Sequence, residues 1–173
     1  GVEELEAQQN ALHEHRPLPK PEKFAGQIAN NVLPLCESFR DDAYSTEEVK
    51  LLYETRKILD DERFEVAMTC VRVPVPVCHS ASVLLETERP IAPEDARRAL
   101  AAFPGIVVMD DPGHNLFPTP ADAAGRDEVF VGRIRRDLTS DRLWLWTVGD
   151  NLRKGAATNA VQIAEELMRR GLR

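Results

Sequence analysis

Segments with strand character in this chain come in groups, and amphipathic helices separate the groups. Val- and Leu-rich runs typical of strands occupy 64–73, 80–88, 106–109, 129–135 and 143–148. Helical periodicity or start signals occupy 2–15, 45–59, 92–102 and 155–172. Because the strands are grouped and do not alternate singly with helices, the order predicts an α+β domain. We expect a mixed, largely antiparallel sheet covered by helices on one face.

Two further segments carry structural expectations. Residues 27–36 combine several aliphatic side chains with Pro34, which predicts a buried strand lying at a sheet edge or a bulge. Residues 110–125 contain three prolines, and this composition favours a long surface loop near a site or an interface.

Composition restricts the classes of partner. The 173 residues carry a formal charge of −7, which disfavours binding to nucleic acid or to an anionic membrane through bulk charge. No apolar run approaches the roughly 18 residues that a membrane span requires. Three irregularly spaced cysteines suggest a reducing cytoplasm. The chain begins directly in an amphipathic helix, so we expect it to be the later part of a longer protein.

The segment 72–79 holds the strongest chemical signal. Arg72 and His79 lie seven residues apart on a stiff, β-branched stretch, where they could face opposite ends of one small substrate. A guanidinium there must find an anion: either a ligand carboxylate or an internal salt bridge. The imidazole of His79 is either a proton carrier near neutral pH or a structural side chain.

Three other positions offer weaker signals. Glu47 and Lys50 share one helix face. They either form a surface ion pair or offer two opposite charges that bind a zwitterion or a phosphate. Asn151 begins the segment that leads into the last helix, and the small residues at 155–157 of this segment permit either close approach to a ligand or tight packing. The basic patch of Gly132, Arg133, Arg135 and Arg136 could pair with the many carboxylates.

Metal and nucleophile chemistry are both disfavoured. The spacing of Cys70, Cys78 and His79 fits no familiar structural zinc pattern, and adjacent strand residues point to opposite faces. The same geometry disfavours activation of Cys78 by His79, and Cys36 has no evident neighbour that would stabilise a thiolate. No Gly-rich dinucleotide fingerprint is present. We expect no metal.

Several of these segments together resemble the aspartate-β-semialdehyde dehydrogenase family. They run in the family's order over nearly the whole chain: GVEEL at 1–5, NVLP at 31–34, EEVK at 47–50, ETRKIL at 54–59, RVPVPVCHS at 72–80, VGRIR at 131–135 and DNLRKGAATN at 150–159. The resemblance implies a C-terminal domain of the glyceraldehyde-3-phosphate-dehydrogenase type. It also implies a reversible, NADP-dependent conversion of aspartyl phosphate to aspartate semialdehyde with release of phosphate, a step toward lysine, threonine and methionine.

The resemblance also implies roles for single residues. His79 looks like the general acid/base that serves a cysteine nucleophile, and Arg72 resembles the clamp on the substrate carboxylate. Glu47 looks like the partner of the substrate ammonium group, Lys50 resembles the lysine that holds substrate or phosphate, and Asn151 sits where the family approaches the cofactor.

The family's nucleophilic cysteine and its NADP-binding region have no counterpart in this sequence. Residues 1–150 therefore resemble the substrate-binding and dimerisation domain, and residues 151–173 a terminal helix that returns to the N-terminal domain. We expect a homodimer that is inactive as an isolated chain. The alternative is a noncatalytic dimerisation or binding module related to the enzyme.

Overall fold

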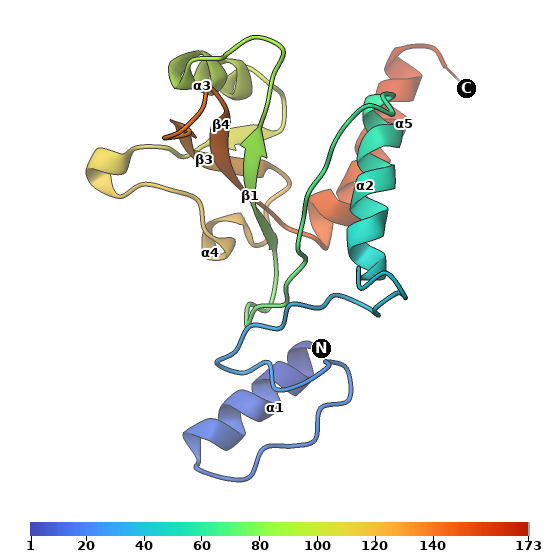
Figure 1. Cartoon of the computed structure of the whole chain (residues 1–173), viewed down its shortest axis with the longest axis vertical. Helices are drawn as coiled ribbons and strands as arrows, with labels where there is room; N and C mark the ends of the chain where they lie inside the picture. Colours follow the sequence, from blue (N-terminus) through green and yellow to red (C-terminus); the bar gives the residue numbers. More distant parts are fainter. Residues whose placement is uncertain (173) are drawn as a thin grey trace. The chain divides into compact units, whose positions relative to one another are not determined.

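A computed structural model describes residues 1–172, and these residues form two compact units. The first unit runs from Gly1 to Pro76 and the second begins at Val77. Helices α1 (Val2–His13) and α2 (Thr46–Leu59) belong to the first unit, whereas every strand lies in the second (Figure 1). Among the described residues no helix is long and apolar enough to cross a membrane.

The core of the first unit forms where α1 meets the segment that follows it. Leu5 of α1 packs with Ile28 and Ala29, which are almost completely buried. The buried Gln8 accepts hydrogen bonds at Oε1 from the backbone N–H groups of Ile28 (2.8 Å) and Ala29 (3.1 Å). A side chain of the helix therefore satisfies the donors that a neighbouring strand would otherwise bind.

The strands expected at 27–36 and 64–73 are therefore wrong. The two segments touch at one isolated bridge between Leu33 and Arg72 and form no ladder. The sequence pattern correctly predicted that Ile28 is buried, but a buried segment forms a strand only if another strand pairs with it. Prolines at 34, 74 and 76 also lack the N–H group that a longer ladder needs.

Helix α2 begins where the sequence indicates. The hydroxyl of the buried Ser45 accepts from the N–H of Glu48, and the Glu48 carboxylate accepts in return from the N–H of Ser45 (2.8 Å). This capping box satisfies donors that the first turn leaves free. The other carboxylate oxygen of Glu48 accepts from the N–H of Cys70 at 2.8 Å, so the cap also holds the later segment in place.

The second unit contains a four-stranded sheet in the order β1-β4-β3-β2. Its strands are β1 (His79–Leu85), β2 (Ile106–Val108), β3 (Val129–Arg136) and β4 (Leu143–Gly149). Strands β1, β4 and β3 pair antiparallel, and β2 pairs with β3 in parallel. The expected α+β fold with a mixed, largely antiparallel sheet is thus confirmed.

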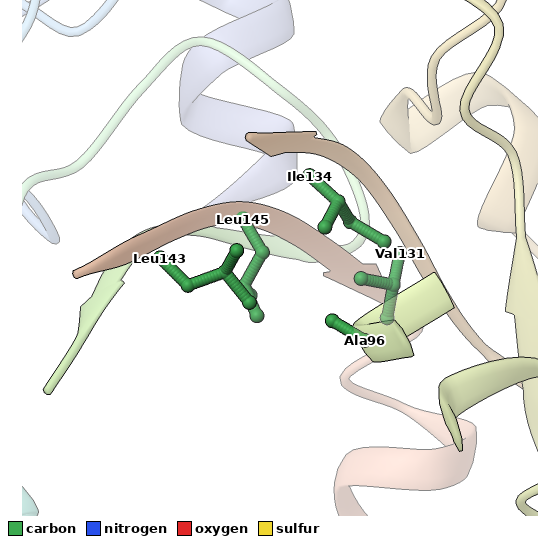
Figure 2. Close-up of a cluster of buried hydrophobic side chains, with 5 residues drawn as sticks. All are labelled: Ala96, Val131, Ile134, Leu143 and Leu145. Atoms are coloured by element: carbon green, nitrogen blue, oxygen red, sulfur yellow. The ribbon is translucent and has the colours of Figure 1, made fainter. Parts of the chain in front are cut away.

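The helices of the second unit cover the sheet unequally. Ala96 of α3 (Pro93–Ala101) packs on Val131, Ile134, Leu143 and Leu145 (Figure 2). The opposite face, which we call the second face, carries Phe130 and Val148 under the single turn α4 (Pro120–Ala123). The predicted loop 110–125 thus contains α4 and the 3₁₀ turn η1 (Pro112–His114). The last helix starts as the π-helical turn η2 (Arg153–Ala157) and continues as α5 (Thr158–Arg169).

A bulge interrupts β3 between Gly132 and Arg135. The carboxylate of Asp110, whose side chain is 1% exposed, accepts from Arg97 Nε (2.7 Å) and from the N–H of Ile134 (3.2 Å). Arg97 in turn donates to the carbonyl oxygen of Ile134. The ion pair therefore replaces the ladder bonds that the bulge removes.

Candidate functional site

The five residues singled out by the sequence fall into two groups, one in each unit. Glu47, Lys50 and Arg72 belong to the first unit, and His79 and Asn151 belong to the second. Each group has its own geometry, and the catalytic or binding role of each residue is a prediction.

In the first unit, Lys50 bridges two carboxylates. Its Nζ lies 2.8 Å from Glu47 Oε2 and 3.5 Å from Glu37 Oε1, and Glu37 also accepts from the Thr46 hydroxyl at 2.7 Å. The hydrogen bond to Glu47 raises the pKa of Lys50, and the Thr46 hydroxyl followed by Lys50 lowers the pKa of Glu37. All three charges face solvent, so a ligand can exchange with either ion pair at little cost.

Arg72 lies beside the same carboxylate cluster. Its backbone exchanges hydrogen bonds with Leu33 at 2.8 and 3.0 Å, which fixes the start of its side chain. Its positive charge also contributes to the lowered pKa of Glu37. Within residues 1–172 the guanidinium makes no ion pair or hydrogen bond, so it keeps its full capacity for an anion.

No cysteine of the first unit has the character of a nucleophile. Burial raises the pKa of the Cys36 thiol in spite of nearby Arg72, and burial together with Cys36 raises the pKa of Cys70. A thiol with a raised pKa holds little thiolate near neutral pH.

In the second unit, His79 is exposed at the first position of β1 and pairs with Gly149 of β4. The preceding residue, Cys78, has a positive φ of 79°. Its N–H donates to Oδ1 of Asn151 at 2.8 Å, and its thiol reaches the carbonyl oxygen of Pro120 at 3.4 Å. The structure thus connects Asn151 to the entry of the strand that bears His79.

A buried carboxylate holds Asn151 in place. Asp150, 3% exposed, accepts from the N–H groups of Gly125 (2.8 Å), Leu152 (2.8 Å) and Arg153 (3.2 Å). The bond from Gly125 is the largest cause of the lowered pKa of Asp150. Ionised at neutral pH, this carboxylate fixes the turn that presents Asn151.

Sequence reasoning missed several of these supporting groups. Asp150 directly precedes Asn151 at the end of a predicted strand, and an Asp-Asn pair there could have been suspected as a turn or cap. Glu37 and Thr46 gave no comparable signal, because only the tertiary fold brings Glu37 to α2. Within the described residues no group of three His, Cys, Asp or Glu side chains could hold a metal ion.

The expected basic patch is divided by the bulge. Arg136 pairs with Asp141 at 2.8 Å, whereas Arg135 stacks its guanidinium 5.6 Å from the centroid of the Trp144 ring. Arg133 and Arg135 line a shallow hollow of about 320 Å³ on the second face, together with Ser82, Phe117, Pro118, Thr119, Pro120 and Trp146. The patch therefore combines two cations with an apolar floor.

Residues 1–154 match the family described as "Semialdehyde dehydrogenase, dimerisation domain". This chain belongs to that family. It is 53% identical over 173 residues to the aspartate-semialdehyde dehydrogenase of Aquifex aeolicus and 47% identical over 171 residues to that of Legionella pneumophila. These matches cover 99% and 98% of the chain, but only 51% and 49% of the two relatives.

Solved structures give the same result. Aspartate semialdehyde dehydrogenase II of Vibrio cholerae superimposes with a TM-score of 0.92 at 43% identity, over 98% of this chain and 50% of that one. A structure of the same Vibrio enzyme complexed with ASA gives a TM-score of 0.91. The chain therefore spans about half the length of the relatives it matches.

Proposed function

We propose that this chain is the C-terminal half of an aspartate-semialdehyde dehydrogenase. The reaction would be the reversible, NADP-dependent reductive dephosphorylation of aspartyl phosphate to aspartate semialdehyde, on the route to lysine, threonine and methionine. Identity of 53% over 99% of the chain carries this proposal. The three cysteines, all free thiols, suit the reducing cytoplasm, which we propose as its location.

The charges of the first unit suit the two ends of an amino-acid substrate. The guanidinium of Arg72 would bind the substrate carboxylate in a bidentate pair. Glu47 would take the ammonium group, because it already holds a cation, Lys50, at 2.8 Å. Lys50 would then turn toward the phosphate or substrate oxygens, and Glu37 would keep it ionised during the exchange.

The second unit would supply the proton transfer. His79 would accept the proton of a cysteine nucleophile contributed by the other half of the enzyme, and would later return it to the departing group. NADP supplies or accepts the hydride when it is bound. Asn151 fits a role near this cofactor, because its Oδ1 is occupied by Cys78 while Nδ2 has no hydrogen bond among the described residues.

We further propose a homodimer, in which a second copy covers the second face of the sheet. The matching family is described as a dimerisation domain. Leu84 and Phe117 are 38% and 42% exposed at this face. The two arginines in its hollow offer cations to a chain whose formal charge is −7. Sedimentation should give a dimer at micromolar concentration, and a monomer alone would contradict this part.

The catalytic assignment is tested in the complete enzyme that contains this chain. Replacing His79 with alanine should lower kcat by more than it changes KM, because proton transfer is needed mainly in the transition state. Replacing Arg72 with alanine should chiefly raise KM for the substrate. Glu65→Ala, which changes an exposed carboxylate of the first unit outside both groups, serves as a control. The reverse split between His79 and Arg72 would contradict the assigned roles.

A noncatalytic dimerisation or binding module is the second candidate. The dimerisation description alone favours it, whereas the presence of all four groups, Glu47, Lys50, Arg72 and His79, favours the enzyme. The isolated chain should not oxidise the semialdehyde with NADP under either proposal. Activity of the complete protein separates the two.

A further inference from the structure

We propose that Asn151 is a positioning residue for His79, which it controls through the backbone of Cys78. Asn151 does this with Oδ1, an atom separate from the donor that it would offer to a cofactor. The proposal extends the proposed function, because it assigns to one side chain a second task at the same site. It depends on three observations within the second unit.

The first observation is the backbone conformation of Cys78. A φ of 79° is rare for a residue with a side chain, and such a residue reverts to a commoner conformation unless its surroundings hold it. Two contacts hold Cys78: its N–H donates to Asn151 Oδ1 at 2.8 Å, and its thiol reaches the Pro120 carbonyl at 3.4 Å. The hydrogen bond from the Cys78 N–H is the stronger of the two contacts, because thiols are weak donors.

The second observation is the place of Cys78 in the chain. Register pairing with β4 starts at His79, opposite Gly149, so His79 is the end residue of the ladder and pairing holds it only on its C-terminal side. Cys78 lies just before the ladder, and its backbone conformation sets the orientation of the peptide group that joins it to His79. A change at Cys78 would rotate this plane, and the imidazole would move with it.

The third observation is the rigidity of Asn151 itself. Asp150 accepts three backbone N–H groups and is almost completely buried, so the turn after β4 cannot shift freely. Two of these donors, Leu152 and Arg153, directly follow Asn151 in the chain. The order of control is therefore Asp150, then Asn151, then Cys78, then His79.

The substitution Asn151→Asp separates the two tasks of the side chain. Aspartate has the same shape and keeps an oxygen acceptor for the Cys78 N–H, but it loses the Nδ2 donor. Asn151→Ala loses both. In the complete enzyme, Asn151→Ala should lower kcat roughly ten- to hundredfold, because small misplacements of a reacting group have effects of this size. Asn151→Asp should keep kcat within about threefold while KM for NADP rises.

Two results in the complete enzyme would overturn the proposal. One is an equal loss of kcat in both variants, which would mean that the amide acts through the cofactor alone. The other is an unchanged pH dependence of kcat in Asn151→Ala, because a misplaced imidazole must alter that profile. Urea unfolding followed by tryptophan fluorescence identifies any variant that has lost the fold.

A second measurement uses the chain by itself and needs no activity. The chain has four histidines, and the ring resonances of His79 are assigned from their absence in His79→Ala. We expect these resonances to shift or broaden in Asn151→Ala and to stay close to wild type in Asn151→Asp. Unmoved resonances in Asn151→Ala would refute the positioning role. If the complete protein proves inactive as a dehydrogenase, the proposed function fails, but this measurement still decides the inference.

Discussion

Replacing Gly132 with alanine should destabilise the sheet of the second unit by about 3 kcal/mol, the upper end of the usual cost of overpacking. A Cβ at this position would lie 2.2 Å from the carbonyl oxygen of Met109 and 2.5 Å from Cδ of Pro118. Ordinary contact begins near 3.4 Å, so the backbone would have to move by about an ångström. One neighbour is backbone and the other is a proline ring, and neither can rotate away.

Urea unfolding followed by tryptophan fluorescence measures this effect in the relevant part of the chain. Both tryptophans of the protein, Trp144 and Trp146, lie in β4, and Gly132 is the register partner of Trp146. With an m-value of about 1.5 kcal/mol per molar urea, the midpoint should fall by about 2 M. The fluorescence transition should stay cooperative.

Gly149→Ala is the matched control. Gly149 also lies in the sheet, but a Cβ there would meet its nearest neighbour, Val129 Cγ2, at an ordinary 3.8 Å. We expect its midpoint to stay within a few tenths of a molar of wild type. A midpoint of Gly132→Ala equal to that of the control would refute the reasoning from close approach.

Three further expectations concern single interactions. Ser45→Ala removes the cap of α2 and should lower the free energy of unfolding of the first unit by about 1 kcal/mol, measured by urea unfolding followed by circular dichroism. The control Ser38→Ala changes an exposed serine outside the cap and should have little effect. The hydrogen bonds from Trp144, Ser140 and Thr139 hold the pKa of Asp137 well below its usual range, so Asp137→Asn should be less stable than wild type at pH 7. This difference is fully present above about pH 4 and should disappear as pH falls through the lowered pKa; a constant difference between pH 7 and pH 2 would contradict it. Lys50→Met should leave the urea midpoint of the isolated chain unchanged, because both of its ion pairs are exposed, and a large shift would show that they are structural.

The helices were predictable because their signals are local. Ser45 caps α2 as its hydroxyl and the following carboxylates indicate, and Pro93 occupies the first turn of α3. The strands of the second unit were also found, since apolar and β-branched side chains mark 129–131 and 143–148. In these cases residues close in sequence decide the local structure.

The failed strands show the limit of that reasoning. A β-rich composition at 27–36 and 64–73 indicates a tendency, but a strand exists only if another strand is available to pair with it. Gln8, some twenty residues earlier, took the N–H groups of Ile28 and Ala29 instead. The periodicity of a short segment cannot predict a hydrogen-bond partner that lies some twenty residues away in the sequence.

Sequence by itself therefore determined the family, the α+β class and the residue types that suit an amino-acid substrate. The tertiary structure decided the surroundings that give those residues their properties. It brought Glu37 to Lys50, left Arg72 without an ion pair among the described residues, and connected Asn151 to the backbone before His79. Residue types are local properties of the chain, whereas a partner 13 or 73 residues away is fixed only when the chain has folded.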